Sequence, residues 1–374
     1  MIPQTDPKAG YLAQQTEIDA AIRRVLDGGR YILGDEVSGF EAEFAAYAGA
    51  AHGIACASGT DALILALRAL EIGPGDAVFT VSHTAVATVA AIELTGATPV
   101  LLDVDGYYGL DVAQLEATLA QWPADAAAKP RAIIPVHLYG QAADMPAIAA
   151  IAAKYDLAII EDGSQAHGAR LGGIGIGHWG ALTAYSLYPT KNLGAIGDGG
   201  IITSNDAGLT QRLKELREYG WRERYVSAIA GMNSRLDPIQ AAILRVKLTR
   251  LAQDTAQRQA IARRYDAGLS GIAGLALPVS RVGSEQVYHQ YVIDVGPERR
   301  DGLRAKLTEA GIGNLVHYPV PVHLQPAYQG RVMLGQGGLA RTERAALSIL
   351  SLPMFPQLSD AQADAVIAAV RAAL

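Results

Sequence analysis

The sequence predicts an α/β protein with a large, mostly parallel sheet domain and a smaller C-terminal α+β domain. From about Ala50 to Ser204, short apolar and β-branched runs alternate with Ala- and Leu-rich stretches of helical period, which is typical of βαβ units. Beyond Gly231 this alternation stops. The 374 residues also exceed the roughly 250–300 that one core commonly reaches. We expect a large domain over 14–250 and a small one over 251–374, with residues 1–13 packing near the latter.

Seven strands and four helices are expected in the large domain. Most of the strands lack polar alternation, as strands covered on both faces should. The strands are expected at Gly53–Ala57, Ala77–Val81, Pro99–Leu102, Ala132–Val136, Leu157–Ile160, Leu182–Ser186 and Gly200–Thr203. The helices between them are expected at Asp61–Leu70, Ala85–Leu94, Val112–Leu119 and Met145–Lys154.

The C-terminal third begins with a charged amphipathic stretch from Pro238 to about Ala267, which predicts one long helix between the domains. A strand at Tyr288–Val295, a helix at Glu298–Ala310, a Pro-rich loop and a terminal helix from Ser359 are expected to follow. This is the size and pattern of a small α+β domain.

Composition excludes several classes of protein. Half of the residues are hydrophobic and 18% are charged, which favours a folded core over disorder. The net charge is −6 with no dense Lys/Arg block, so nucleic acid is not an expected partner. A single cysteine, Cys56, forms no internal disulfide, the first residues lack a signal-peptide pattern, and apolar stretches end well short of the ~18–20 residues that cross a bilayer. We therefore expect a cytoplasmic protein without a membrane span.

The first candidate site segment is Ser58-Gly59-Thr60, a turn of small residues between a buried strand and a helix. Free N–H groups at a helix N-terminus, together with hydroxyl groups and a glycine that lets a ligand approach, can bind a phosphate. The alternative is an ordinary N-cap on a strand-to-helix turn.

The second candidate is the acidic pair Glu161 and Asp162 at the carboxyl end of an apolar strand. Ligands of open α/β sheets bind at that edge, and a carboxylate there can bind a cation, a metal or a protonated ring nitrogen. A metal is not expected, because His137, His167 and His178 show no ligand spacing. The alternative is an aspartate that caps the next turn.

The third candidate is Lys191, which lies in an apolar, Gly-rich segment without a charge partner nearby in the sequence. Desolvation would lower the pKa of this lysine towards that of an amine able to form a Schiff base. The alternative is a lysine whose side chain extends from a loop into solvent. Together the three segments fit one cofactor, pyridoxal 5′-phosphate (PLP), which needs a phosphate site, an acid at the pyridinium nitrogen and a lysine for the aldehyde.

Five ordered segments resemble the DegT/DnrJ/EryC1/StrS family of sugar aminotransferases, which have the aspartate-aminotransferase type (fold type I) of PLP fold. The segments are SGTDAL, EDGSQAHGA, SLYPTKNLGAIGDGG, GMNSRLDPIQAAIL and HYPVPVHLQPAY, and they span nearly the whole chain. The resemblance implies that Lys191 forms the internal aldimine, that Asp162 pairs with the pyridinium nitrogen and that Gln165 lies against the ring near its phenolic oxygen. It further implies phosphate contacts from Gly59, Thr60 and Ser186, and from Asn233 to the neighbouring subunit of a homodimer with shared active sites.

One position departs from the family pattern. Many members have an aromatic residue that stacks on the ring where this sequence has Ala85. If the backbone is extended here, His83 and Ala85 lie on the same face, so His83 is expected to replace the stacking residue. The alternative is that His83 only bonds a loop carbonyl.

The segment Tyr188-Pro189-Thr190-Lys191-Asn192 is similar to that of family members that act on 3-keto sugars. The resemblance implies amino transfer from L-glutamate to the C3 keto group of a dTDP-linked 3-keto-6-deoxyhexose. A 4-keto sugar or a UDP- or GDP-linked sugar remains the alternative. The expected substrate contacts are Tyr188, Tyr225, His317, Tyr318 and His323, each of which has packing as its alternative role.

Other classes fit less well. The segment Gly175–Gly180 matches the GxGxxG pattern of nicotinamide-dependent enzymes, but it precedes a strand instead of joining a strand to a helix. Related PLP-dependent sugar dehydratases replace the lysine, which is present here as Lys191. A non-catalytic PLP-fold protein would have lost Lys191 or Asp162, and both are present.

Overall fold

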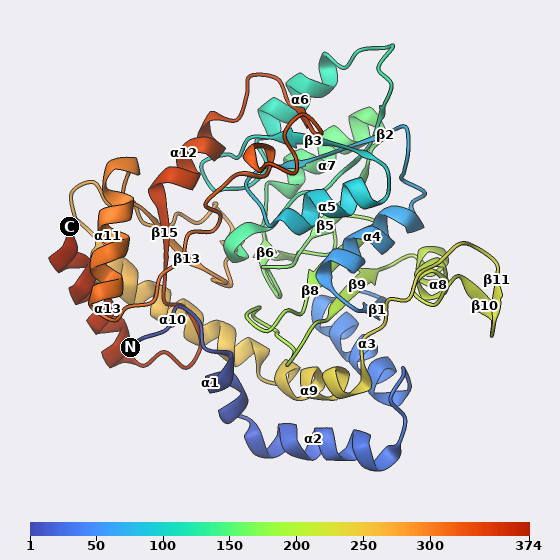
Figure 1. The fold of residues 1–374 in the computed structure, drawn as a ribbon, viewed down its shortest axis with the longest axis horizontal. Coiled ribbons are helices and arrows are strands. Elements are labelled where there is room, and N and C mark those ends of the chain that lie inside the picture. Colours follow the sequence, from blue (N-terminus) through green and yellow to red (C-terminus); the bar gives the residue numbers. More distant parts are fainter.

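The computed structural model describes residues 1–374 and confirms the α/β class. Its centre is an eight-stranded sheet in the order β1-β9-β8-β5-β4-β2-β3-β14. Figure 1 labels most of these strands. Strand β9 is antiparallel to both β1 and β8, and the other neighbouring pairs are parallel. The carboxyl ends of all strands except β9 therefore lie at one edge.

The sheet strands are β1 His52–Cys56, β2 Asp76–Val81, β3 Thr98–Leu102, β4 Lys129–Ile133, β5 Ala158–Asp162, β8 Leu182–Ser186, β9 Gly200–Ser204 and β14 Met333–Leu334. The helices of the first two thirds are α1 Pro7–Leu12, α2 Gln15–Gly28, α3 Asp35–Ala48, α4 Gly59–Ala69, α5 Val86–Leu94, α6 Val112–Ala120, α7 Met145–Tyr155, α8 Ala207–Leu216 and α9 Pro238–Leu248, with a 3₁₀ turn, η1, at Leu138–Gly140. Short strands β6 Arg170–Leu171, β7 Ile174–Gly175 and β12 Ser284–Glu285 form a small sheet, and β10 Trp221–Glu223 pairs with β11 Val226–Ser227.

Helices cover both faces of the sheet, which explains the missing polar alternation. In β2, Phe79 packs into one hydrophobic core with Phe44 of α3, whereas Val78 packs into a second core with Leu65 of α4. Because successive strand residues point to opposite faces, a strand buried on both sides is apolar at every position.

The C-terminal segment has a core of its own around Tyr265, Tyr291 and Leu350. It comprises α10 Leu251–Leu269, β13 Tyr291–Asp294, α11 Pro297–Glu309, η2 Val322–Leu324, α12 Ala340–Ser348, β15 Ile349–Leu352 and α13 Asp360–Ala373. The N-terminal residues contact this segment, because Ile2 bridges Ile312 and Gln4 donates to Gln290 (2.6 Å). A domain boundary near residue 250 stays a prediction.

The prediction of one helix from Pro238 to Ala267 is wrong. The chain breaks at Thr249 and Arg250, where the Thr249 hydroxyl donates to the Val246 carbonyl (2.7 Å) and Arg250 has φ −108° and ψ −4°. The break lets α9 pack on α2 and α3 while α10 packs on α13. Two helices are needed because their apolar faces are buried in different parts of the protein.

The predicted strand at Tyr288–Val295 is also shorter than expected and begins at Tyr291. Tyr288 has a φ of +45°, and the Gln290 N–H donates to the Tyr139 carbonyl instead of to a strand.

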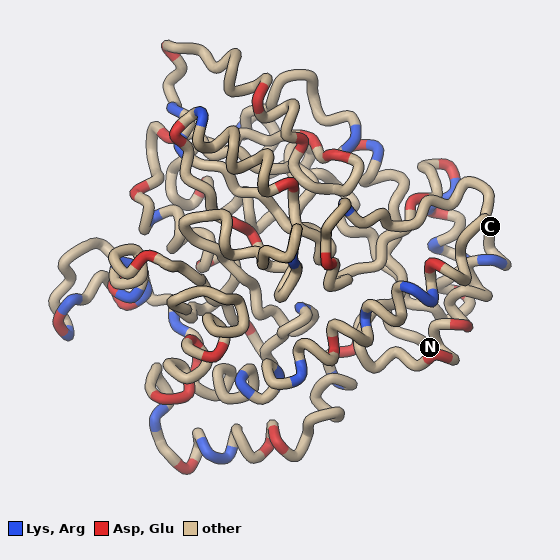
Figure 2. The backbone as a smooth tube through the Cα atoms, turned by 180° about the vertical axis from the view of Figure 1, so that it is seen from behind, with Lys and Arg blue, Asp and Glu red and all other residues tan.

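Acidic and basic residues are interspersed over the backbone in Figure 2 without a broad region of one sign. None of the helices combines the length and the apolar composition needed to span a bilayer.

Candidate active site

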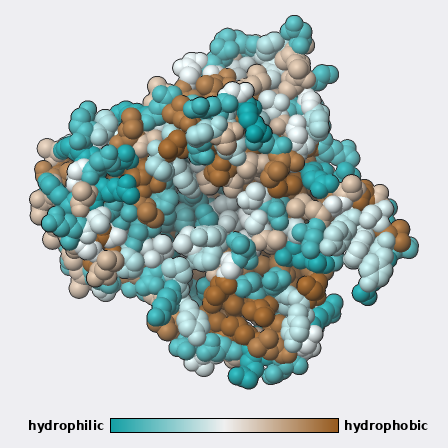
Figure 3. All heavy atoms as spheres, viewed as in Figure 1, coloured by the Kyte–Doolittle hydropathy of each residue, from teal (hydrophilic) through white to brown (hydrophobic).

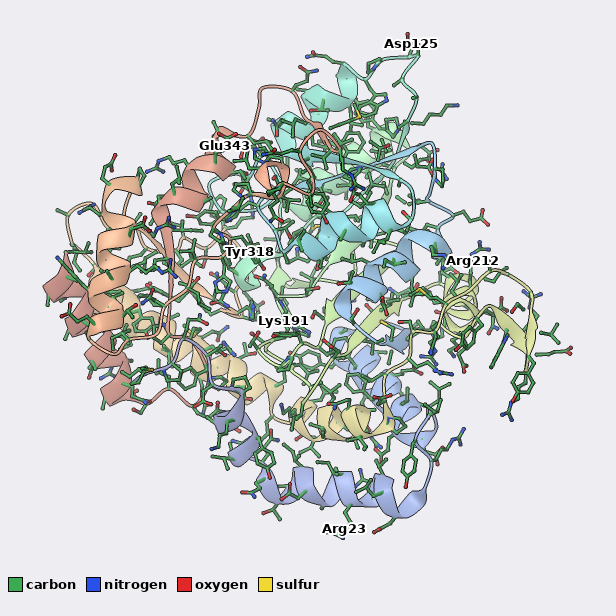
Figure 4. All side chains as sticks on the ribbon, viewed as in Figure 1. Arg23, Asp125, Lys191, Arg212, Tyr318 and Glu343 are labelled. Atoms are coloured by element: carbon green, nitrogen blue, oxygen red, sulfur yellow. The ribbon has the colours of Figure 1, made fainter.

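A cavity of about 230 Å³ lies at the sheet edge where β1, β5 and β8 end. Figure 4 places Lys191 in the middle of the molecule, and Figure 3 shows a hollow in the corresponding part of this face. The cavity is lined by Ser58, Gly59, Thr60, Leu63, Thr84, Ala85, Ala87, Val136, Asp162, Ser164, Gln165, Ser186, Tyr188, Lys191, Asp198 and Gly199. The three candidate segments predicted from the sequence thus meet at one site, together with residues from the segment 84–87 and Val136.

The turn after β1 forms one wall of the cavity. Ser58 caps helix α4, since its Oγ accepts a hydrogen bond from the Asp61 N–H (3.0 Å). Gly59 is required here because a Cβ at this position would lie 2.6 Å from the Cβ of Ser186. The N–H groups of Gly59 and Thr60 have no partner within the helix, so this wall offers amide donors beside the hydroxyls of Thr60 and Ser186. The N-cap alternative and the anion site are both compatible with this geometry.

Asp162 lies at the end of β5 and is only 4% exposed. Its Oδ2 accepts from the Thr88 hydroxyl (2.9 Å), and its Oδ1 accepts from the Ser164 N–H (3.1 Å). The Thr88 hydroxyl also pairs with that of Thr84 (3.0 Å). The sequence reasoning missed Thr88, because its partner Asp162 lies 74 residues further along the chain.

We predict that Thr88→Val lowers turnover about 10-fold, because a hydrogen bond to a buried carboxylate contributes about 1.5–3 kcal/mol. The measurement is steady-state kinetics of the purified variant. Thr95→Val, at the C-cap of the same helix, is the matched control, since the Thr95 hydroxyl donates to the Ile92 carbonyl (2.7 Å) and not to the site. Equal turnover in the two variants would contradict a role for Thr88.

The Lys191 loop is held by a hydrogen bond within itself and by one from helix α9. The Lys191 N–H donates to the Tyr188 carbonyl (2.8 Å), and the Gly194 carbonyl accepts from the Lys247 ammonium group (2.6 Å). Desolvation of its ammonium group lowers the pKa of Lys191 to about 8, and the negative charge of Asp162 opposes this shift. A much larger fraction of neutral amine is therefore present near pH 7–8 than for an exposed lysine.

Gln165 has both ends of its amide occupied. Its Oε1 accepts from the Tyr139 N–H (2.8 Å), and its Nε2 donates to the Tyr318 hydroxyl (2.9 Å). The structure therefore brings together most of the predicted site: Gly59, Thr60, Asp162, Gln165, Ser186, Tyr188 and Lys191 line the cavity, and Tyr318 joins them through Gln165.

Three predicted histidines lie outside the cavity wall. His83 is fully buried, and its Nε2 pairs with the Tyr139 hydroxyl (2.7 Å), so Ala85 faces the cavity in its place. His317 pairs through Nδ1 with the Ser351 hydroxyl (2.8 Å). The stacking role of His83 stays a prediction.

His323 has both ring nitrogens occupied in this structure. Its Nδ1 pairs with the Ser82 hydroxyl (2.7 Å) and its Nε2 with Glu343 (3.2 Å). This arrangement fits the packing alternative better than substrate contact. Tyr225 and Asn233 are both exposed and do not line the cavity of their own chain.

The GxGxxG-like segment binds a carboxylate of the protein itself. Glu161 is fully buried and accepts from the N–H groups of Gly177 (3.1 Å), Trp179 (3.0 Å) and Gly180 (2.9 Å) and from His137 Nε2 (3.0 Å). Burial would raise the pKa of Glu161, but His137 and the main-chain amides outweigh it and hold the pKa below its usual value. The segment is thus structural.

A sequence profile described as the DegT/DnrJ/EryC1/StrS aminotransferase family matches residues 13–371. The chain belongs to this family. It is 47% identical over 371 residues to the dTDP-3-amino-3,4,6-trideoxy-alpha-D-glucose transaminase of Streptomyces venezuelae, a match that covers 99% of this chain and 95% of the relative. It is 41% identical to the UDP-N-acetyl-3-dehydro-alpha-D-glucosamine 3-aminotransferase of Acidithiobacillus ferrooxidans, covering 100% and 98% of the two chains.

The fold of this aminotransferase matches solved structures of the family. The crystal structure of S. venezuelae DesV in complex with a ketimine intermediate superposes with a TM-score of 0.94 at 47% identity, covering 99% of this chain and 98% of DesV. The comparison confirms the fold and the aminotransferase class that the five sequence segments predicted.

Proposed function

We propose that this aminotransferase uses PLP to move an amino group from L-glutamate to the C3 keto group of a dTDP-linked 3-keto-6-deoxyhexose. The observation that carries the proposal is the cavity that unites Lys191, with its lowered pKa, the buried carboxylate of Asp162 and the N-terminus of α4. The name of the S. venezuelae relative supports the substrate class, and the ketimine bound to DesV supports amino transfer.

The residues present fit PLP. The first-turn amides of α4 and the hydroxyls of Thr60 and Ser186 would hold its phosphate, and Asp162 would pair with its ring nitrogen. PLP supplies an electron sink and carries the amino group between the two substrates. The site needs no bulk positive charge for this, so a net charge of −6 is compatible with phosphorylated ligands.

The protein's own groups have separate tasks. Lys191 would hold the cofactor aldehyde through its neutral amine; once the amino substrate has displaced it there, the freed Nζ can move a proton at the substrate Cα as general base and acid. Asp162 stays oriented because Thr88 and the Ser164 N–H both donate to it. Gln165 presents an amide to the cavity next to Tyr318, where polar groups of a sugar or of the cofactor can bind.

The pKa of Lys191 predicts how PLP uptake depends on pH. Because its neutral fraction sets the rate, uptake by the cofactor-free protein is expected to rise about fivefold from pH 7 to 8 and to level off above pH 9. Stopped-flow absorbance measures this rate. A rise of about tenfold from pH 7 to 8, repeated from pH 8 to 9 and continuing beyond it, would show that Lys191 has the pKa of an exposed lysine.

Regiochemistry and nucleotide are tested directly. The enzyme is offered dTDP-linked 3-keto and 4-keto hexoses and a UDP-linked 3-keto hexose, each with L-glutamate, and the aminated products are identified by NMR. We expect the dTDP-linked 3-keto sugar to give the highest kcat/KM. Amination at C4 alone would overturn the C3 assignment and leave the PLP assignment intact, whereas preference for the UDP-linked sugar would favour the chemistry named for the A. ferrooxidans relative.

We further propose a homodimer with shared active sites. The β10–β11 hairpin projects from the body of the chain in Figure 1, with Tyr225 72% exposed at its turn and Asn233 exposed at its base. Large apolar side chains are also exposed along and beside α2, at Leu12, Leu26, Tyr31 and Ile32, and Figure 3 shows hydrophobic side chains gathered low in the view. Such a group of apolar side chains marks an interaction surface.

Mixed dimers test the sharing of sites. Lys191→Ala and Asn233→Ala subunits are each expected to be nearly inactive alone. If Asn233 serves the neighbouring site, a hybrid dimer has one site with both native residues, so random mixing restores about a quarter of wild-type activity. Absence of restoration despite subunit exchange would place Asn233 in the site of its own chain.

A further inference from the structure

Tyr139 connects four separate segments around the cavity. It lies in the η1 turn, is only 4% exposed and has a φ of +59°, a conformation that side-chain-bearing residues rarely adopt. Its N–H donates to Gln165 Oε1 (2.8 Å), its carbonyl accepts from the Gln290 N–H (3.3 Å), and its hydroxyl contacts both the His317 carbonyl and His83 Nε2. Every polar group of this residue is therefore used.

The directions of these hydrogen bonds follow from the donors available. The His317 carbonyl only accepts, so the single hydroxyl proton of Tyr139 points to it. The Tyr139 oxygen must then accept from His83, which places the His83 proton on Nε2. Burial lowers the pKa of His83 to about 4, with Asp103 opposing, so the ring is neutral at pH 7 and has this one proton.

The same reasoning fixes the amide of Gln165. The Tyr139 N–H only donates, so the atom facing it must be the amide oxygen, and the Gln165 NH₂ group faces Tyr318. One N–H of this group donates to the Tyr318 oxygen (2.9 Å), which leaves the second N–H and the Tyr318 hydroxyl proton as donors. Because Gln165 lines the cavity, Gln165 and Tyr318 together offer hydrogen-bond donors there. These donors are complementary to a ligand oxygen that carries negative charge.

We propose that Tyr139 is a positioning residue: its main-chain N–H fixes the donor direction of Gln165, and its hydroxyl attaches the His317–Tyr318 loop of the C-terminal segment to the cavity. The proposal rests on the proposed function, because it takes the cofactor's phenolic oxygen or a substrate oxygen as the group that receives these donors. Gly140 completes the turn: it has a φ of +99°, and a Cβ there would lie 2.8 Å from the main-chain nitrogens of Tyr288 and His289.

A double-mutant cycle tests the proposal on the PLP-bound protein. Tyr139→Phe, Tyr318→Phe and the double variant are compared by the pH titration of the visible absorbance band, by KM for the sugar and by the unfolding midpoint of the cofactor-free protein. If Tyr139 acts through the His317–Tyr318 loop, each single variant shifts the pH titration of the absorbance band and raises KM about 10-fold, with a smaller change in kcat. The double variant then has the same titration shift and KM as Tyr318→Phe alone. Tyr108→Phe is the matched control, because the Tyr108 ring packs on Tyr139 (5.4 Å between centroids) without a hydrogen bond from its hydroxyl.

Two results would overturn the positioning role. One is additive effects of Tyr139→Phe and Tyr318→Phe; the other is a lower unfolding midpoint for Tyr139→Phe with titration and KM unchanged. If Tyr139→Phe does not fold, His83→Phe, which removes the donor to Tyr139, is expected to shift the titration in the same direction, and no shift would overturn the proposal. The titration needs no sugar. If the wild-type protein binds PLP but does not aminate the sugar, that result contradicts the proposed function, and the titration still tests the positioning role of Tyr139.

Discussion

Lys191→Ala is expected to lower turnover by about 10⁴-fold, because it removes both the covalent attachment of the cofactor and the proton-transferring amine. Lys191 is the single lysine that lines the cavity, and burial of its ammonium group lowers its pKa. The variant is also expected to bind PLP non-covalently, so borohydride reduction should not attach the cofactor to the protein. Mass spectrometry after reduction measures the link, and steady-state kinetics measures turnover.

The matched control is Lys154→Ala, which removes an exposed lysine whose ammonium group pairs with Glu116 (2.7 Å) on the surface. This change is expected to leave turnover and cofactor attachment unaltered, since exposed ion pairs contribute about 0–1 kcal/mol. If borohydride still fixed PLP to the Lys191→Ala protein in the folded state, another amine would be the attachment site and the assignment would be wrong.

The sheet was predictable because burial on both faces leaves a direct trace in the sequence. Apolar runs such as those around Phe79 and Ile160 have no polar alternation, and both residues are fully buried. The helix break at Thr249 was not predictable from periodicity, because the 3.6-residue pattern continues through it. The three N-terminal helices were also missed, since the strand-helix alternation begins only after them.

The candidate site shows the same difference between residues found from local patterns and residues whose roles depend on distant partners. Residues within the quoted motifs, such as Lys191, Asp162 and Gly59, meet at the cavity because each lies at or after the carboxyl end of a strand, and these strands end at one sheet edge. Thr88 and Tyr139 were missed because their roles depend on partners 74 and 26 residues away, which no local spacing reveals. Conversely, His323 was selected for its residue type, although its ring nitrogens are occupied by Ser82 and Glu343.

The second large effect is expected for Asp162→Asn, which should lower kcat by about 10²–10³-fold while the protein still folds. Asparagine has the same shape, and its carbonyl oxygen can accept from the Ser164 N–H as Oδ1 does now. Its NH₂ group can donate to the Thr88 oxygen, since that hydroxyl can turn its proton to Thr84. What the variant lacks is the negative charge that favours a protonated ring nitrogen in the cofactor.

Turnover, PLP affinity by fluorescence titration and the unfolding midpoint separate this electrostatic effect from a structural one. We expect kcat to fall far more than affinity changes, because the first-turn amides of α4 and the Ser186 hydroxyl still bind the phosphate. Asp125→Asn, at an exposed loop tip far from the cavity in Figure 4, is the matched control and should behave as wild type. If Asp162→Asn kept more than about a tenth of wild-type kcat, the carboxylate would serve to orient Thr88 and Ser164, and its charge would have no part in the reaction.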